Sequence, residues 1–177
     1  NGIEIAGIDA GNNVVFNSAT VSDSVATGIY IHNNDGTVSV NSDIDVDNSG
    51  EYGVFVQQNN AAVDFGGEVD VFNSVDGGFW NHQGTDTFIV SGPVTVDQTT
   101  AGSGIYVSTN TGTVDFVSTV AVDDSAGYGM YLANNDGNVS VVGATTINDS
   151  DLAGLRVEQT DNTSDGNATF NTVDVDL

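Results

Sequence analysis

Residues 28–40 read GIYIHNNDGTVSV, and residues 104–116 repeat the same pattern as GIYVSTNTGTVDF. A glycine followed by an apolar, a usually aromatic and a second apolar residue recurs along the chain, and successive glycines are 25 or 26 residues apart. These glycines are Gly2, Gly28, Gly53, Gly78, Gly104, Gly129 and Gly154. A fixed period of this length is the signature of a repeat architecture. The repeat therefore predicts one domain, 1–177, made of seven units.

Each unit contains three short runs in which every second residue is apolar, the pattern of a β-strand. In the second unit these runs are 29–31, 38–40 and 44–46. Strands this short bury an apolar face only when each pairs with its counterpart in the next unit. We therefore predict an all-β fold, a three-sided parallel β-helix, or β-solenoid, with seven coils of about 25 residues.

The motif G-[IV]-[YF]-[IV]-x-x-N-x-G-x-V-x-[VF] is clearest at 28–40 and 104–116. It resembles the right-handed parallel β-helix repeats of the pectate-lyase-like superfamily and of autotransporter and haemagglutinin-type adhesin passengers. The resemblance covers all seven units and implies a right-handed coil. Because this scaffold carries enzymes, adhesins and fibres, the resemblance leaves the function open.

The chain is strongly acidic, with 25 Asp and Glu residues against one basic residue, Arg156, and a net charge of −24. Such a chain is repelled by nucleic acid and by anionic membrane surfaces, so we expect neither as a partner. Apolar stretches such as 14–16 and 88–90 run for only three or four residues and are far too short to span a membrane. The charge predicts a secreted or cell-surface protein, stabilised by salt or divalent cations outside the cell.

Stacking of the units in register places equivalent residues in columns with a spacing of about 4.8 Å. The second residue after each glycine forms an outward aromatic column, Tyr30, Phe55, Trp80, Tyr106 and Tyr131. Such a column can stabilise the sheet, contact a protein or contact a glycan. The sixth residue after each glycine forms a structural asparagine ladder, Asn34, Asn59, Asn110 and Asn135. Buried amides of this kind bond to one another and to the turn backbone.

A polysaccharide lyase or hydrolase is the enzymatic alternative. A lyase needs a base beside a cation, but the chain has no lysine, and Arg156 lies far along the stack from His32 and His82. A hydrolase needs two carboxyl groups, and Asp45 and Asp70 would lie one coil apart. Such pairs arise by chance in so acidic a chain, and no apolar neighbour raises either pKa. The sequence therefore favours a protein without catalytic residues.

Calcium is the metal that the composition favours, because it binds carboxylate and carbonyl oxygens. The first candidate cluster, on adjacent third strands, is Asp43, Asp45, Glu68 and Asp70. The second is the loop containing Asp161 and Asp165, where the closing glutamate of a calcium loop is missing. Solvated acidic turns are the alternative for both clusters. Glycosylation signals occur at Asn138, Asn148, Asn162 and Asn167, relevant only to a eukaryotic-type secretory pathway.

Neither end of the sequence reads as a helical cap, so we expect open terminal coils that pair with further strands. Stacking unit seven of one subunit on unit one of the next would bring Arg156 opposite Glu4. We therefore predict a non-enzymatic structural or adhesive element. It is either a filament subunit that self-associates end to end or a stalk segment with flanking β-helix coils. The alternatives are a carbohydrate-active enzyme and an adhesin tip that binds glycans.

Overall fold

The computed structural model describes residues 1–159 and 166–176, which form strands and turns with no helix. The first strand of each coil is β1 (Ile3–Ala6), β4 (Ile29–His32), β7 (Tyr52–Gln57), β10 (Gly77–His82), β13 (Ile105–Ser108), β16 (Met130–Ala133) or β18 (Leu155–Glu158). The second strands are β2 (Asn13–Phe16), β5 (Thr37–Val40), β8 (Val63–Phe65), β11 (Phe88–Val90) and β14 (Val114–Phe116). The third strands are β3 (Ala19–Ser24), β6 (Ile44–Ser49), β9 (Val69–Ser74), β12 (Val94–Thr99) and β15 (Val120–Ser125). The longer β17 (Val139–Asn148) and β19 (Ala168–Asp176) run through the second and third positions.

Every strand pairs in parallel with its counterpart in the neighbouring coil, with equivalent residues side by side. Val38 pairs with Val63 on the second strands, and Val114 pairs with Val139 three coils further on. On the third strands Ile44 pairs with Val69. The parallel β-solenoid of about seven turns, with a period of about 25 residues, is therefore confirmed.

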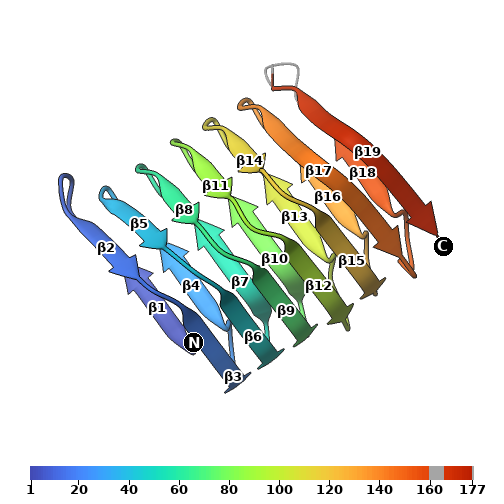
Figure 1. The fold of residues 1–177 in the computed structure, drawn as a ribbon, viewed down its shortest axis with the longest axis horizontal. Coiled ribbons are helices and arrows are strands. Elements are labelled where there is room, and N and C mark those ends of the chain that lie inside the picture. The colour runs from blue at the N-terminus through green and yellow to red at the C-terminus, as the bar shows by residue number, and fades with distance from the viewer. Residues whose placement is uncertain (160–165, 177) are drawn as a thin grey trace.

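The three strand positions of each coil form two sheets. The first strands make a 7-stranded sheet, and the second and third strands share a 12-stranded sheet. In Figure 1 the 7-stranded sheet lies behind the 12-stranded sheet, and the chain advances from the blue end to the red end. The chain runs up through the rear sheet and down through the front sheet, which makes the coil right-handed.

The core lies between the two sheets and is built from stacked β-branched and phenylalanine side chains. Val38, Ile44 and Val54 are fully buried, and burying such a side chain contributes about 1.5–3 kcal/mol. Near the middle of the stack Phe65 meets Phe79 and Phe88 edge-on, with ring centroids 6.3 and 5.3 Å away. Alternation of inward and outward side chains therefore buries one face of each strand.

The glycine that begins each unit is required by close packing. A Cβ added at Gly53 would lie 2.1 Å from Val71 Cγ1 and 2.7 Å from the carbonyl oxygen of Gly78. Equivalent contacts of 2.1–2.4 Å to a third-strand side chain face Gly28, Gly78 and Gly104. The start of each first strand therefore passes so close to the third strand that only glycine fits.

Single left-handed residues turn the chain at both ends of the first strand. Asn48 and Asn73, the next-to-last residues of the third strands β6 and β9, adopt φ of 57°, and Asn33 adopts 53° after the first strand. Asparagine tolerates this conformation better than most residues, which explains its frequency at the corners. None of the described residues forms a helix with the length and apolar character needed to cross a membrane.

Candidate functional site

The aromatic column occupies the outer face of the first-strand sheet. Tyr30 pairs with Phe55, Phe55 with Trp80, Trp80 with Tyr106, and Tyr106 with Tyr131. Successive ring centroids are 4.9 to 5.0 Å apart. All five side chains are half-buried, because each ring is covered in part by its neighbours.

The rings of the aromatic column stack face to face along most of its length. The ring planes differ by 15° between Tyr30 and Phe55, by 21° between Phe55 and Trp80, and by 13° between Tyr106 and Tyr131. A ring covered on both faces presents its edge to solvent, whereas a sugar ring stacks on a free aromatic face. The geometry of the column therefore favours stabilisation of the sheet over glycan contact.

A second column, which the sequence analysis missed, flanks the aromatic column. We call the residues before the seven repeat glycines the flanking column: Asn1, Thr27, Tyr52, Gly77, Ser103, Tyr128 and Ala153. Tyr52 packs against Phe55 at 5.0 Å and against Trp80 at 4.6 Å. The residue types of the flanking column do not recur from unit to unit, so the repeat pattern did not indicate this column.

Gly77 and Ser103 interrupt the flanking column between its two tyrosines and leave a pocket of about 180 Å³, which we call the aromatic hollow. Its lining includes the rings of Tyr52, Trp80 and Tyr106. Asp76 also lines it, and burial, followed by the charges of Asp76 and Glu51, raises the pKa of Tyr52. The hollow therefore combines aromatic walls with a negative potential.

Arg156 is held within its own part of the chain. Its Nη2 lies 2.5 Å from Glu158 Oε2, its Nη1 donates to the Tyr128 hydroxyl, and its Cζ lies 5.1 and 5.3 Å from the ring centroids of Tyr128 and Tyr131. The hydroxyl of Tyr131 donates to the same Glu158 oxygen at 2.7 Å. These hydrogen bonds, with that from Tyr131 the largest cause, lower the pKa of Glu158. Burial, followed by the bond to Glu158, raises the pKa of Tyr131 to about 12.

Glu4, the other residue predicted at a subunit junction, also has partners in its own chain. His32 Nε2 lies 2.9 Å from Glu4 Oε1, and Asn1 Nδ2 donates to Glu4 Oε2 at 2.9 Å. The bond with His32, followed by that with Asn1, lowers the pKa of Glu4. Arg156 and Glu4 occupy the column positions expected of them, and a contact between two subunits stays a prediction.

The asparagine ladder is buried at the corner that follows the first strand. Asn34 Nδ2 donates to Asn59 Oδ1 at 2.8 Å, and Asn110 Nδ2 donates to Asn135 Oδ1 at 3.1 Å. Between these two segments stands Gly84, whose backbone N–H donates to Asn110 Oδ1 at 2.6 Å. The amides therefore bond to each other and to backbone groups that the corner would leave without partners.

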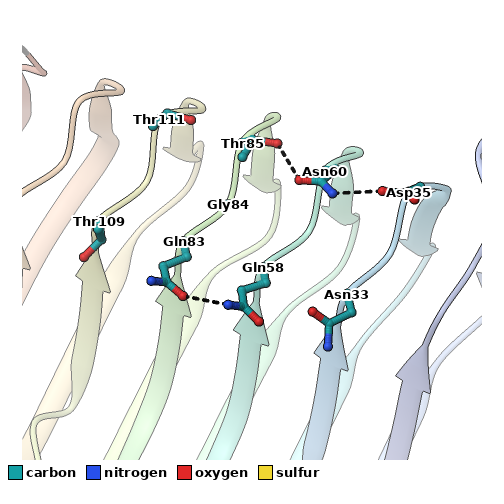
Figure 2. Close-up of a pocket in the computed structure, with 9 residues that line it drawn as sticks. All are labelled: Asn33, Asp35, Gln58, Asn60, Gln83, Gly84, Thr85, Thr109 and Thr111. Carbon is teal, nitrogen blue, oxygen red and sulfur yellow. Dashed lines mark hydrogen bonds between the residues drawn. The ribbon is translucent and has the colours of Figure 1, made fainter.

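Outside the asparagine ladder lies a second feature that the repeat pattern did not predict, a polar groove of about 600 Å³ (Figure 2). One row of its lining is Asn33, Gln58, Gln83 and Thr109, and the other is Asp35, Asn60, Thr85 and Thr111. Gln58 donates to Gln83 at 3.1 Å, and Asn60 donates to Asp35 at 2.8 Å. Amide and hydroxyl groups with one carboxylate therefore line a groove that spans several coils.

The acidic residues of the first predicted calcium cluster lie on adjacent strands. Asp45 pairs directly with Asp70. Burial, followed by the charge of Asp45, raises the pKa of Asp70, so the expectation that no burial raises the pKa of this pair was wrong for Asp70. Asp43 Oδ1 accepts the backbone N–H of Glu68 at 3.1 Å. In the parts of the chain that the structure describes, no three Asp, Glu, His or Cys side chains gather closely enough to hold a metal ion.

The second predicted calcium cluster, Asp161 and Asp165, lies outside the described residues, as does Asn162. Calcium binding therefore stays a prediction for both clusters. His32 and His82 are two coils apart, as expected, with Gln57 between them in register. Burial is the main influence on His82 and lowers its pKa.

No protein-family model matches this sequence, and neither a curated protein nor a solved structure matches it. The fold alone therefore defines the class of protein: the chain is a parallel β-solenoid. The resemblance to pectate-lyase-like and adhesin repeats is supported at the level of this fold, and a closer relationship stays a prediction.

Proposed function

We propose that this protein is a non-enzymatic extracellular structural or adhesive element, a β-solenoid rod whose coils are continued end to end. The continuing coils belong to a second copy or to flanking β-helix coils of a longer surface protein. The observation that carries the proposal is the unbroken parallel pairing of equivalent residues along the whole stack. A coil with this geometry is a template for the next coil at each open edge.

The terminal coils offer both backbone groups and apolar side chains to a continuing coil. Within the described residues β1 pairs only with β4, and β19 pairs only with β17. Val173 and Val175 of β19 are each 40% exposed, although their partners Thr145 and Ile147 in β17 are buried. One further coil would cover these side chains as every inner coil covers its neighbour.

The extracellular setting rests on charge. A net charge of −24 on one rod opposes stacking of a second rod of the same charge at low salt. The Debye length falls from about 30 Å at 0.01 M salt to about 8 Å at 0.15 M, so salt removes most of this repulsion. End-to-end association is therefore expected to need extracellular concentrations of salt or divalent cations.

Sedimentation velocity and electron microscopy of the purified chain at 20 and 500 mM NaCl test the filament form. We expect rods that lengthen with protein concentration at high salt. Val173→Lys places a charge on the terminal edge and should leave monomers. Val142→Lys is the matched control, because Val142 is 57% exposed on β17, one coil in from that edge. A wild-type monomer under all conditions, or equal effects of both lysines, contradicts the filament form.

A second candidate function, binding of a neutral glycan, is favoured by the polar groove. Its amide and hydroxyl groups repeat every 4.8 Å or so along the axis, and such groups bond well to sugar hydroxyls. A glycan array screened with wild type and with Gln58→Ala/Gln83→Ala tests this function, with Thr20→Ala at an exposed position on the third strand β3 as control. Loss of binding in the double variant alone supports it, and an array without a signal refutes it.

A further inference from the structure

The asparagine ladder is interrupted in the fourth coil, where Gly84 takes the place of an asparagine. Where the next coil has a ladder asparagine, its side-chain oxygen accepts a backbone N–H from the equivalent position of the coil before. The N–H of Gly84 donates to Asn110 Oδ1 at 2.6 Å, and the N–H of Asn110 donates to Asn135 Oδ1 at 3.1 Å. Gly84 has no side chain, so it offers no such acceptor to the N–H of Asn59 in the third coil.

The interruption also removes a donor. Ladder nitrogens donate to the carbonyl oxygen of an inward-facing first-strand residue in the preceding coil. Asn59 Nδ2 donates in this way to Ile31 at 3.2 Å. Asn135 Nδ2 donates to Val107 at 3.1 Å. The register equivalent of Ile31 and Val107 in the third coil is Val56, and its carbonyl oxygen receives no ladder amide from the fourth coil.

The fourth coil also carries a polar residue in the core. Asn81 of β10 is 2% exposed and pairs with Val56 and Val107. The other described members of its column are all apolar: Ile5, Ile31, Val56, Val107, Leu132 and Val157. Among the described residues Asn81 Oδ1 has no hydrogen-bond partner, whereas nearly all buried polar groups in native proteins bond to protein or to ordered water.

A cavity of about 10 Å³ joins these groups, and its lining includes Val56, Asn59, Asn81 and Gly84. This volume is about the room that one water molecule needs, and it is too small for a larger ligand. Gly84 also lines the polar groove (Figure 2), so the cavity and the groove meet at a residue without a side chain.

From the two missing ladder bonds, the unpartnered oxygen of Asn81 and the size of the cavity, we infer that the cavity binds one water molecule in place of the ladder amide. The water accepts the N–H of Asn59 and donates to Asn81 Oδ1 and to the carbonyl oxygen of Val56. Three hydrogen bonds of this kind are typical of a buried water. The inference is independent of end-to-end association and of glycan binding, because the site is buried within one chain.

A high-resolution crystal structure tests the site directly. In wild type we expect one density peak at about 2.7–3.2 Å from Asn59 N, Asn81 Oδ1 and Val56 O. In Gly84→Asn the new amide should occupy that place, because a Cβ added at Gly84 meets only Asn110 Oδ1, at 3.0 Å. A wild-type cavity without density, or an Asn81 oxygen bonded to a protein group, overturns the inference.

Nuclear magnetic resonance of the chain in solution gives a second measurement. A water held at the site transfers magnetisation to the amide proton of Asn59, with the sign of a molecule that tumbles with the protein. We expect this signal in wild type and in the control Gln83→Ala, which changes the groove beside Gly84 but not the lining of the cavity. Asn81→Val, which introduces the valine found in both neighbouring coils, should lose the signal. A signal that is absent from wild type, or that persists unchanged in Asn81→Val, overturns the inference.

Discussion

Replacing Asn59 by alanine removes the inner residue of the first segment of the asparagine ladder. Asn59 is 3% exposed, and its Oδ1 accepts a hydrogen bond from Asn34 at 2.8 Å. Its Nδ2 donates to the carbonyl oxygens of Ile31 at 3.2 Å and Gln57 at 3.1 Å. A buried hydrogen bond contributes about 1 kcal/mol net, so the loss of three predicts a free energy of unfolding lower by about 3 kcal/mol.

Denaturant unfolding followed by circular dichroism measures this loss, and thermal unfolding should show a Tm lower by roughly 6–12 °C. Asn60→Ala is the matched control, because Asn60 is adjacent but exposed. Its bonds to Asp35 and Thr85 compete with water, so we expect a loss below about 0.5 kcal/mol. Equal losses in the two variants would refute a structural role for the buried ladder.

The remaining predictions concern packing and charge. Gly53→Ala should lower the free energy of unfolding by about 1–3 kcal/mol in the same assay, because the added Cβ would lie 2.1 Å from Val71; an unchanged stability would contradict the packing. The raised pKa of Asp70 means that the folded state binds its proton more readily than the unfolded state, so ionised Asp70 destabilises the fold at neutral pH. Asp70→Asn should therefore have a higher free energy of unfolding than wild type at pH 7. The difference should shrink as the pH falls through the raised pKa of Asp70, and a difference independent of pH would contradict this reasoning. Raising NaCl from 20 to 500 mM should raise the Tm, and dialysis against a chelator at low salt should lower it. An unchanged Tm in both experiments would argue against stabilisation by cations.

The sequence was sufficient to predict the register of the stack. In a parallel solenoid equivalent residues become neighbours, so a spacing of 25 or 26 residues places Tyr30 beside Phe55 and Val38 beside Val63. Glycine at the start of each unit was part of the same signal, because the close approach to the third strand recurs in every coil. A repeated physical constraint leaves a repeated pattern in the sequence.

The features that sequence analysis missed are those that differ from coil to coil. The aromatic hollow arises from two small residues, Gly77 and Ser103, in a column with no consensus. Arg156 bonds to Glu158, two residues along the same strand, and the repeat pattern did not predict this pair; its contact with Glu4 of another subunit stays a prediction. A long, flexible side chain pairs with the nearest carboxylate on its own face of the strand, and spacing between repeats carries no information about that choice.

Cysteine cross-linking tests most directly whether equivalent positions are vertical neighbours, and the chain has no cysteine of its own. Ser39 and Asp64 are partners on adjacent strands, as are Asp115 and Ser140. Paired parallel residues lie about 4.8 Å apart, within the range that a disulfide bridges, whereas Ser39 and Asp115 are three coils, or about 14 Å, apart. We predict an intrachain disulfide in the S39C/D64C and D115C/S140C variants after mild oxidation, and none in S39C/D115C. Free thiols in both partner pairs, or a bridge in S39C/D115C, would contradict the stacked solenoid.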